Sequence, residues 1–431
     1  MKMIRTIAAV VIALITGISY GQVTDQVFDV VVAHDNSGDY TTLQAAIDAA
    51  PVNSTQPYLI FIKNGEYDEL INIPKEKPFL HIIGQDVEKT VIRHMIHCGG
   101  KDSEFFEYSV NNEQSENYKH NAVMDNWGSD FYMENITLEN TWGTSRQTGP
   151  QALAIRTCAD RMAFYNCRFR SFQDTWFTTV NDTDRHYIKN CLLEGAIDYI
   201  FGSGNILAEG TTFYNVRSGS VITAPSHTES TFGYVFRDCI IDGNEKAADG
   251  KVKFGRPWHN NPKNIWINTT LRIPIDPRGW TDMGTIPALF TDYNTHDING
   301  LLSDVSQRKK TFSYRERNSD KIIEGSCMGE LDHEDVKRYT YENMILSTDK
   351  WNPKIFMAPM NAPHIIKGIN RTITWEPVEG ARGYVITNEK SQILAITKKN
   401  SFFVNRKNNY YIIQAVSEYG HLGCRSYVHF K

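Results

Sequence analysis

The sequence lacks the features of several protein classes. It has no excess of basic residues, because 45 Lys and Arg stand against 50 Asp and Glu, for a formal net charge of −5. A nucleic-acid-binding protein needs a basic stripe, so we expect no nucleic-acid partner. Beyond residue 18 no run approaches the roughly 20 apolar residues of a membrane span. We therefore expect no membrane-spanning segment.

The cysteines and histidines are too scattered to indicate a metal site. The seven cysteines are odd in number and their spacing matches no zinc site. The histidines form neither a metal cluster nor part of a Ser-His triad; we considered His34, His94, His97 and His259. The sequence thus predicts neither a metal nor another cofactor.

The first residues have the pattern of a secretory signal. Lys2 and Arg5 are followed by the apolar run 6–18, and small residues stand near Gly21. This order predicts a cleaved signal peptide over residues 1–21 and a secreted or periplasmic protein. The alternative, a membrane anchor, would need a longer apolar run.

The central region contains a weak repeat. Three stretches read as aromatic or β-branched residues, then Asn or Asp, then Cys: 164–169, 187–192 and 236–240. Cys191 follows Cys167 by 24 residues, and Cys239 follows Cys191 by 48. Short strands at this period predict a right-handed parallel β-helix, in which equivalent positions of stacked coils form ladders. Buried ladder packing is the expected role of these cysteines.

Two helices are expected beside the coils. Thr42 is a candidate N-cap for a helix with its apolar residues Leu43, Ala46 and Ile47 on one face, and this helix would cover the first coil. A second helix is predicted over residues 332–344, with Asp332 as N-cap.

The composition changes after Trp351. A proline-rich linker precedes alternating segments at 372–375, 383–387, 401–404 and 410–416, which are typical of strands. We predict a β-helix over residues 22–356, then a linker and a small fibronectin type III-like β-sandwich over 357–431.

Two aspartates recur at the same place in the repeat. Asp174 lies seven residues after Cys167, and Asp198 lies seven after Cys191. If the cysteines stack, the aspartates stack too, about 4.8 Å apart. Two such carboxyl groups repel, so one pKa should rise and leave an acid beside a base. Chance recurrence of Asp in β-helix turns is the alternative.

Five blocks then resemble the pectin methylesterase (pectinesterase) family, in the family's order and over roughly residues 28–355. They are Gly65-Glu-Tyr-Asp-Glu69, Gly149-Pro-Gln-Ala-Leu153, Gln173-Asp-Thr-Trp176, Leu193-Glu-Gly-Ala-Ile-Asp-Tyr-Ile-Phe-Gly202 and Gly255-Arg-Pro-Trp258. The resemblance is to the bacterial secreted type. Trp176 and Tyr199 depart from the commoner Leu and Phe, which bears on the shape of a subsite and not on the chemistry.

The resemblance implies a role for each site residue. Asp198 would be the nucleophile, held ionised by Arg256, and Asp174 would be the general acid and base. Gln151 would donate a hydrogen bond to the oxyanion, with Gln173 assisting. Trp258 and Trp280 would pack on sugar faces, and Tyr199 and Trp176 would shape the substrate subsite.

The function implied is hydrolysis of methyl esters on pectin (methyl-esterified homogalacturonan) by a monomer, with release of methanol. Four alternatives stay open: a β-helix pectate lyase, a polygalacturonase, a non-catalytic glycan-binding solenoid, and an esterase that acts on another acyl ester. A lyase would need an acidic calcium cage. A polygalacturonase would use paired carboxylates on a glycosidic bond.

Overall fold

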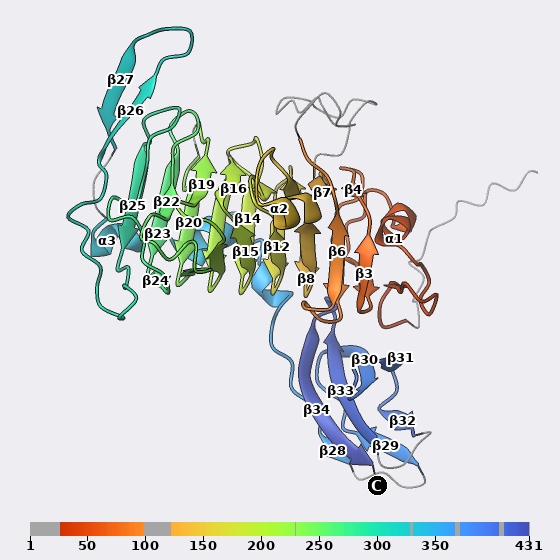
Figure 1. The fold of residues 1–431 in the computed structure, drawn as a ribbon. Helices are drawn as coiled ribbons and strands as arrows, with labels where there is room; N and C mark the ends of the chain where they lie inside the picture. Colours follow the sequence, from red (N-terminus) through yellow and green to blue (C-terminus); the bar gives the residue numbers. More distant parts are fainter. Residues whose placement is uncertain are drawn as a thin grey trace, which may run out of the picture.

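The computed structural model describes residues 26–98, 122–228, 230–327, 331–366, 371–404 and 409–430. The predicted signal peptide lies outside these ranges. Residues 30–293 form a parallel β-helix whose strands stack into three long sheets (Figure 1). This confirms the predicted fold class. No helix among the described residues is long and apolar enough to span a membrane.

The three sheets take one strand in turn from most coils. Sheet A contains β1 (Val30–Val32), β2 (Tyr58–Ile62), β5 (Leu80–Gly84), β8 (Phe131–Glu134), β11 (Met162–Tyr165), β14 (Arg185–Lys189), β17 (Asn205–Glu209), β20 (Tyr234–Arg237), β23 (Lys263–Ile267) and β25 (Leu289–Tyr293). Sheet B contains β3 (Gly65–Asp68), β6 (Thr90–His94), β9 (Thr137–Asn140), β12 (Arg168–Arg170), β15 (Leu192–Gly195), β18 (Thr212–Asn215), β21 (Ile240–Gly243) and β24 (Thr270–Leu271). Sheet C contains β4 (Ile71–Ile73), β7 (Ala122–Asn126), β10 (Leu153–Thr157), β13 (Trp176–Phe177), β16 (Ile197–Gly202), β19 (Val221–Pro225) and β22 (Lys253–Gly255).

The cysteines fill the interior as predicted. Cys167, Cys191 and Cys239 are at most 3% exposed and belong to the core inside the coils. The backbone N–H of Cys167 lies 3.4 Å from Sγ of Cys191, so the two side chains are direct neighbours in the ladder. All three are free thiols. Their small volume suits a position where the chain turns between sheets A and B.

The residue before each cysteine makes that turn. Asn166, Asn190 and Asp238 all have positive φ, between 48° and 53°, and Gly210 has φ 59° at the equivalent place. Asn and Asp tolerate this left-handed conformation better than other side chains do. Their amides also stack, since Nδ2 of Asn166 donates to Oδ1 of Asn135 on the preceding coil (2.6 Å). The repeated Asn-Cys pattern therefore records one tight turn per coil.

Helix α1 (Leu43–Ala49) covers the first coil, as predicted, and Thr42 is its N-cap. Its apolar face is fully buried, and Glu69 accepts hydrogen bonds from the backbone N–H groups of Leu43 (3.0 Å) and Gln44 (3.1 Å). The side-chain amide of Gln44 also bonds both backbone groups of Asn72, on the edge strand β4. Gln44 thus takes the place of a further strand at this edge of sheet C.

Beyond the last coil the chain returns along the outside of sheet A. A hairpin of β26 (Thr311–Arg315) and β27 (Ile322–Ser326) projects from that end (Figure 1). The single helix predicted over 332–344 is wrong. A short α3 (His333–Val336) begins with the expected Asp332 cap, and a separate π-helical turn follows (Glu342–Leu346), before a 3-10 turn (Pro353–Ile355). The buried Met344 and Ile345 pack on sheet A and determine this shape.

The C-terminal part is a two-sheet β-sandwich, as predicted. One antiparallel sheet contains β28 (Ile365–Ile366), β29 (Thr372–Trp375) and β32 (Ser401–Phe403); the other contains β30 (Ala381–Asn388), β31 (Ile393–Thr397), β33 (Asn409–Ser417) and β34 (Leu422–Phe430). Residues of both sheets share one core around Trp375 and Ile413. The predicted boundaries at residues 21 and 356 stay predictions.

The sandwich packs against the first coils of sheet A. His421 Nδ1 lies 2.9 Å from a carboxylate oxygen of the buried Glu134 on β8. Gln85 donates to the backbone oxygen of Ser391 (2.6 Å). A Cβ added at Gly420 would lie 2.9 Å from Ile83, so the backbone of the sandwich lies directly on that side chain. Buried hydrogen bonds and apolar contacts therefore fix the sandwich on the β-helix.

Candidate active site

The two aspartates lie on neighbouring coils of sheet C. Gln173 pairs with Ile197 in a parallel bridge, and Trp176 pairs with Ile200. Asp174 and Asp198 therefore occupy equivalent positions, on strands about 4.8 Å apart. The N–H of Asp174 donates to the oxygen of Ile197 (3.0 Å), which fixes the register. The stacking that the spacing predicts is confirmed.

Both aspartates have a left-handed backbone. Their φ values are 61° for Asp174 and 47° for Asp198. The register of β16 against β19 shifts between Ile197 and Ile200, which marks a bulge around Asp198. Bulges and left-handed residues redirect side chains, and they cluster at functional sites. Here the bulge takes Asp198 out of the regular inward and outward alternation of its strand.

Arg256 contacts Asp198 through a two-pronged ion pair. Its Nε lies 2.8 Å from Oδ1, and its second guanidinium nitrogen lies 2.5 Å from Oδ2. Gly255 allows this approach, because a Cβ there would lie 2.1 Å from Oγ1 of Thr223 and 2.7 Å from Asn264. The Gly-Arg pair in the block at 255–258 thus joins a close strand contact to a cation directed at Asp198.

The electrostatic environment separates the two carboxyl groups. Burial raises the pKa of Asp174 well above its usual range, and the neighbouring charge of Asp198 raises it further. Burial also raises the pKa of Asp198, but the hydrogen bonds and charge of Arg256 oppose that rise. The side chain of Asp174 forms no hydrogen bond within the described part of the chain. Asp174 is therefore the member that holds a proton more strongly.

Two glutamines stand beside the pair. Gln151 precedes β10, and the N–H of Ala152 donates to the oxygen of Gln173 on the next coil (3.0 Å). Both glutamines are half-buried, and neither side-chain amide bonds another residue in the described ranges. Two amide donors thus lie beside the carboxyl pair, Gln173 on the coil of Asp174 and Gln151 on the coil before it, and both are available to a ligand. Within the same ranges, no three His, Cys, Asp or Glu side chains gather in a group that could hold a metal ion.

Trp258 lies at the edge of this site, half-buried on the outer face of sheet C. Its ring meets that of Phe201 edge to face, with centroids 5.7 Å apart. Phe201 in turn meets Phe177 at 5.1 Å. Phe177 and Phe201 are almost fully buried and support the ring of Trp258, which is partly exposed two residues after Arg256. An exposed aromatic ring of this kind can pack on the face of a sugar ring.

Three predicted substrate contacts are wrong. Trp176 and Tyr199 are fully buried, and Trp280 is 1% exposed. All three belong to the core inside the coils, so none can touch a sugar. Trp280 packs between Phe254 and Phe290, with centroids 5.1 and 4.9 Å away. Successive side chains of a strand point to opposite faces of the sheet, so Trp176 points inward and its neighbour Phe177 points outward.

Sequence reasoning missed a buried ion pair on the same outer face. Arg156 on β10 lies directly opposite Asp125 on β7, with Nε 2.5 Å from Oδ1 and both side chains at most 4% exposed. Phe177 is the next residue in this row. A charge directly after the apolar run 152–155 was the available signal, because buried charges need a partner.

Comparison with known proteins identifies the family of this chain. The family model described as Pectinesterase matches residues 29–328. Pectinesterase 31 of Arabidopsis thaliana is 34% identical over 269 residues, which cover 59% of this chain and 76% of the relative. Probable pectinesterase/pectinesterase inhibitor 58 of the same plant is 33% identical over 294 residues, covering 65% of this chain and 48% of the relative. The chain spans about half the length of several such curated relatives.

A solved structure has the same fold. The pectin methylesterase from carrot superposes with a TM-score of 0.59 at 23% identity, covering 75% of this chain and 94% of that one. The relatives named here come from plants, so the bacterial type stays a prediction. The family model covers more than half of the 431 residues and includes every predicted site residue. The chain therefore belongs to the pectinesterase family.

Proposed function

We propose that this protein hydrolyses the methyl esters of methyl-esterified polygalacturonan and releases methanol and pectate. The observation that carries the proposal is the pair of stacked aspartates, of which Arg256 contacts one alone. Such a pair supplies an ionised nucleophile beside a protonated acid, the two groups that acyl transfer at a carboxylic ester needs. We also propose that the protein acts as a secreted or periplasmic monomer.

The proposed reaction runs in two steps. A carboxylate oxygen of Asp198 attacks the ester carbonyl, and Asp174 gives its proton to the departing methanol. This leaves an anhydride between Asp198 and the galacturonate. Asp174, now ionised, takes a proton from a water molecule that attacks the anhydride, which frees Asp198 and the galacturonate. Gln151 and Gln173 would donate hydrogen bonds to the oxygen that becomes negative in each step.

The arrangement of the site supports a polymeric substrate. The outer face of sheet C runs along the whole β-helix, with the aspartates in its middle coils. Trp258, above Phe201, gives one sugar ring an apolar surface beside the nucleophile. We expect the substrate chain to lie along this face, with one esterified unit over Asp198.

One assay separates this function from its alternatives. The protein is incubated with highly methylated pectin, and methanol, new reducing ends and unsaturated products are measured in one sample. We expect methanol alone. New reducing ends would indicate a polygalacturonase, unsaturated products a lyase, and binding without any product a glycan-binding solenoid. Release of a different acid from acylated pectin, without methanol, would indicate an esterase of another specificity.

A further inference from the structure

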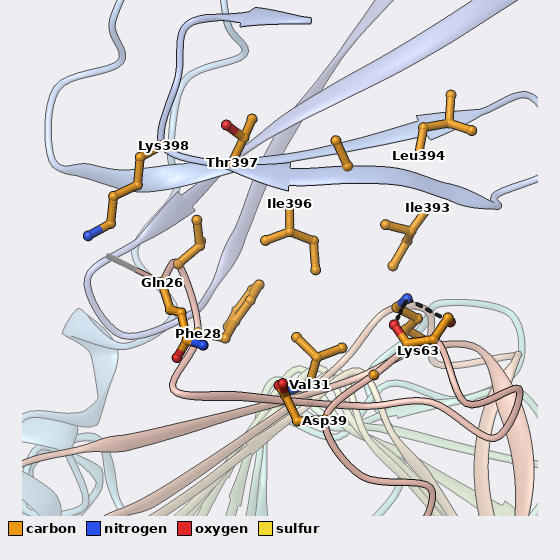
Figure 2. Close-up of a pocket in the computed structure, with 14 residues that line it drawn as sticks. Gln26, Phe28, Val31, Asp39, Lys63, Ile393, Leu394, Ile396, Thr397 and Lys398 are labelled. Atoms are coloured by element: carbon orange, nitrogen blue, oxygen red, sulfur yellow. Dashed lines mark hydrogen bonds between the residues drawn. The ribbon is translucent and has the colours of Figure 1, made fainter. Parts of the chain in front are cut away.

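A groove separates the first coils of the β-helix from the edge strand β31 of the sandwich. Its two parts have volumes of about 490 Å³ and 780 Å³, and they share Ser37, Lys63, Ile393 and Leu394. Each volume is in the range of small-ligand sites. Apolar side chains stand on both sides of the first part, and Figure 2 shows Phe28 and Val31 on one side facing Ile393 and Ile396 on the other. The sandwich and the β-helix both contribute to it, so it exists only when the sandwich is docked.

The second part carries positive charge. Lys63, Lys89 and Lys390 line it together with one acidic residue, Asp35. None of the three lysines forms an ion pair with any described residue. Lys63 donates to the backbone oxygen and the hydroxyl of Ser37, each at 2.9 Å, and so points along the groove wall. Three ammonium groups against one carboxylate give this part of the groove a net positive charge, in a chain whose net charge is −5.

Polar groups continue between these lysines. Asn64, Gln85 and Gln392 line the same part. Lys89 follows the register of the coils, because its backbone oxygen accepts from Gly65 (2.8 Å), which places Lys89 beside Asn64. A ligand with carboxylates at intervals and hydroxyls between them matches such an alternation of ammonium and amide groups.

We infer that this groove is a second binding site, for a run of de-esterified galacturonate units. The inference rests on the proposed function, which makes this acidic polysaccharide the product. The groove lies on the first coils, away from the aspartates of the middle coils. Each exposed lysine contributes little by itself. On a polymer that also occupies the active site, however, even weak binding raises the effective concentration of substrate.

The test maps binding by hydrogen–deuterium exchange of the full chain carrying Asp198→Asn, so that nothing is hydrolysed. We expect a de-esterified oligogalacturonide to protect residues 33–39 and 390–398 from exchange. A fully methyl-esterified oligomer, which lacks the charges, should leave them unprotected. Protection absent with the acidic oligomer, or equal with the esterified one, would overturn the inference. Equal protection by polyglutamate would overturn the saccharide class.

A pair of variants locates the contact. The double variant Lys89→Gln/Lys390→Gln should need about ten times more acidic oligomer for half-maximal protection. The control variant Lys75→Gln/Lys246→Gln, which changes two exposed lysines outside the groove, should need no more than the unchanged protein. An equal effect of both pairs would reduce the site to general charge attraction and contradict the proposal. When the same two pairs of substitutions are made in protein that keeps Asp198, methanol release from a short methylated oligomer should be the same in both variants. If methanol release fails while protection persists, the proposed function is wrong and the binding site stands.

Discussion

Arg256 makes two otherwise similar carboxyl groups unequal. It contacts both oxygens of Asp198 but forms no hydrogen bond with Asp174, whose pKa burial and the charge of Asp198 raise against a smaller opposing effect of Arg256. The same argument assigns the roles: the ionised member can attack, and the protonated member can give its proton away. Both residues are aspartates, so the residue type cannot decide these roles, and the position of Arg256 does.

Replacing each aspartate by asparagine should give different losses. Asp198→Asn removes the nucleophile, and we expect methanol release to fall by at least about 10⁴-fold, the scale for losing one member of a catalytic unit. Asp174→Asn keeps the nucleophile and should lose about 10²–10⁴-fold, because general acid help is removed. Methanol release at saturating pectin, with circular dichroism as a folding control, measures both. A folded Asp198→Asn protein with near-normal turnover would contradict the nucleophile assignment.

The raised pKa of Asp174 also affects stability. The folded carboxyl keeps its proton to higher pH than the unfolded one, whose pKa is about 3.9, so folding is linked to proton uptake. Its contribution to stability is therefore lost as the pH rises from about 4 through the folded pKa. We expect Asp174→Asn to unfold a few degrees higher than wild type at neutral pH, and equally near pH 3.

Thermal unfolding at the two pH values measures this difference. Asp238→Asn is the matched control, because Asp238 is exposed and sits in a turn with a similar φ of 53°. A stabilisation by Asp174→Asn that is the same at both pH values would mean that the charge is not its cause.

At the scale of the element, the turn before each cysteine decides the path of the coil. Asn166 has φ 48° and its amide bonds Asn135, whereas Gly210 takes the same conformation without a side chain. A Cβ at Gly210 would lie 2.7 Å from Oδ1 of Asn190, so the column has no room there. The turn therefore has two requirements, positive φ and a stacked amide, and glycine meets only the first.

Substitutions of Asn166 separate these two contributions. Asn166→Ala should destabilise the protein by about 2 kcal/mol, roughly half from the strain of positive φ and half from the lost hydrogen bond. Asn166→Gly removes the strain and should cost about 1 kcal/mol. Midpoints of urea unfolding measure both. An alanine variant as stable as the glycine variant would show that the backbone conformation contributes nothing.

The repeated turn explains which parts of the fold can be predicted from the sequence. The spacing of Asn-Cys pairs predicts the coils, because each coil repeats one turn, and the same spacing places Asp174 over Asp198. It is harder to predict from the sequence which side chains near the site point outward. The alternation of side chains along a strand places Phe177 on the outer face and Trp176 on the inner one. The bulge at Asp198 interrupts this alternation in β16, where Tyr199 is buried. The partner of Arg156 lies in another coil, 31 residues away, where local pattern gives no register.

At the scale of the whole molecule, the sandwich and the site lie on different sheets. The sandwich packs on sheet A through Ile83 and Glu134, and the aspartates lie on sheet C. A protein that ends at Ala358 should therefore keep its turnover per folded molecule. It should also unfold at lower temperature, because uncovering Phe28 and Ile83 costs on the order of 2 kcal/mol for each side chain.

Methanol release and thermal unfolding of the truncated protein test both halves of this prediction. Glu134→Gln in the full chain is the matched control, since it weakens the buried contact with His421 and leaves the apolar contacts in place. Complete loss of turnover in a folded truncated protein would mean that the sandwich helps to shape the cleft.

Helix α1 determines where the β-helix stops. The first coil of a parallel β-helix has the same backbone N–H and C=O groups on its free edge as on the edge paired with the second coil. The strands themselves therefore set no limit on the number of coils. Gln44 occupies the free N–H and C=O of Asn72, and the apolar face of α1 covers the open lumen. Without the helix, the first coil of one molecule would be a template for the strands of another. The helix, with the amide of Gln44 on the edge of sheet C, thus opposes end-to-end growth of the β-helix into fibrils.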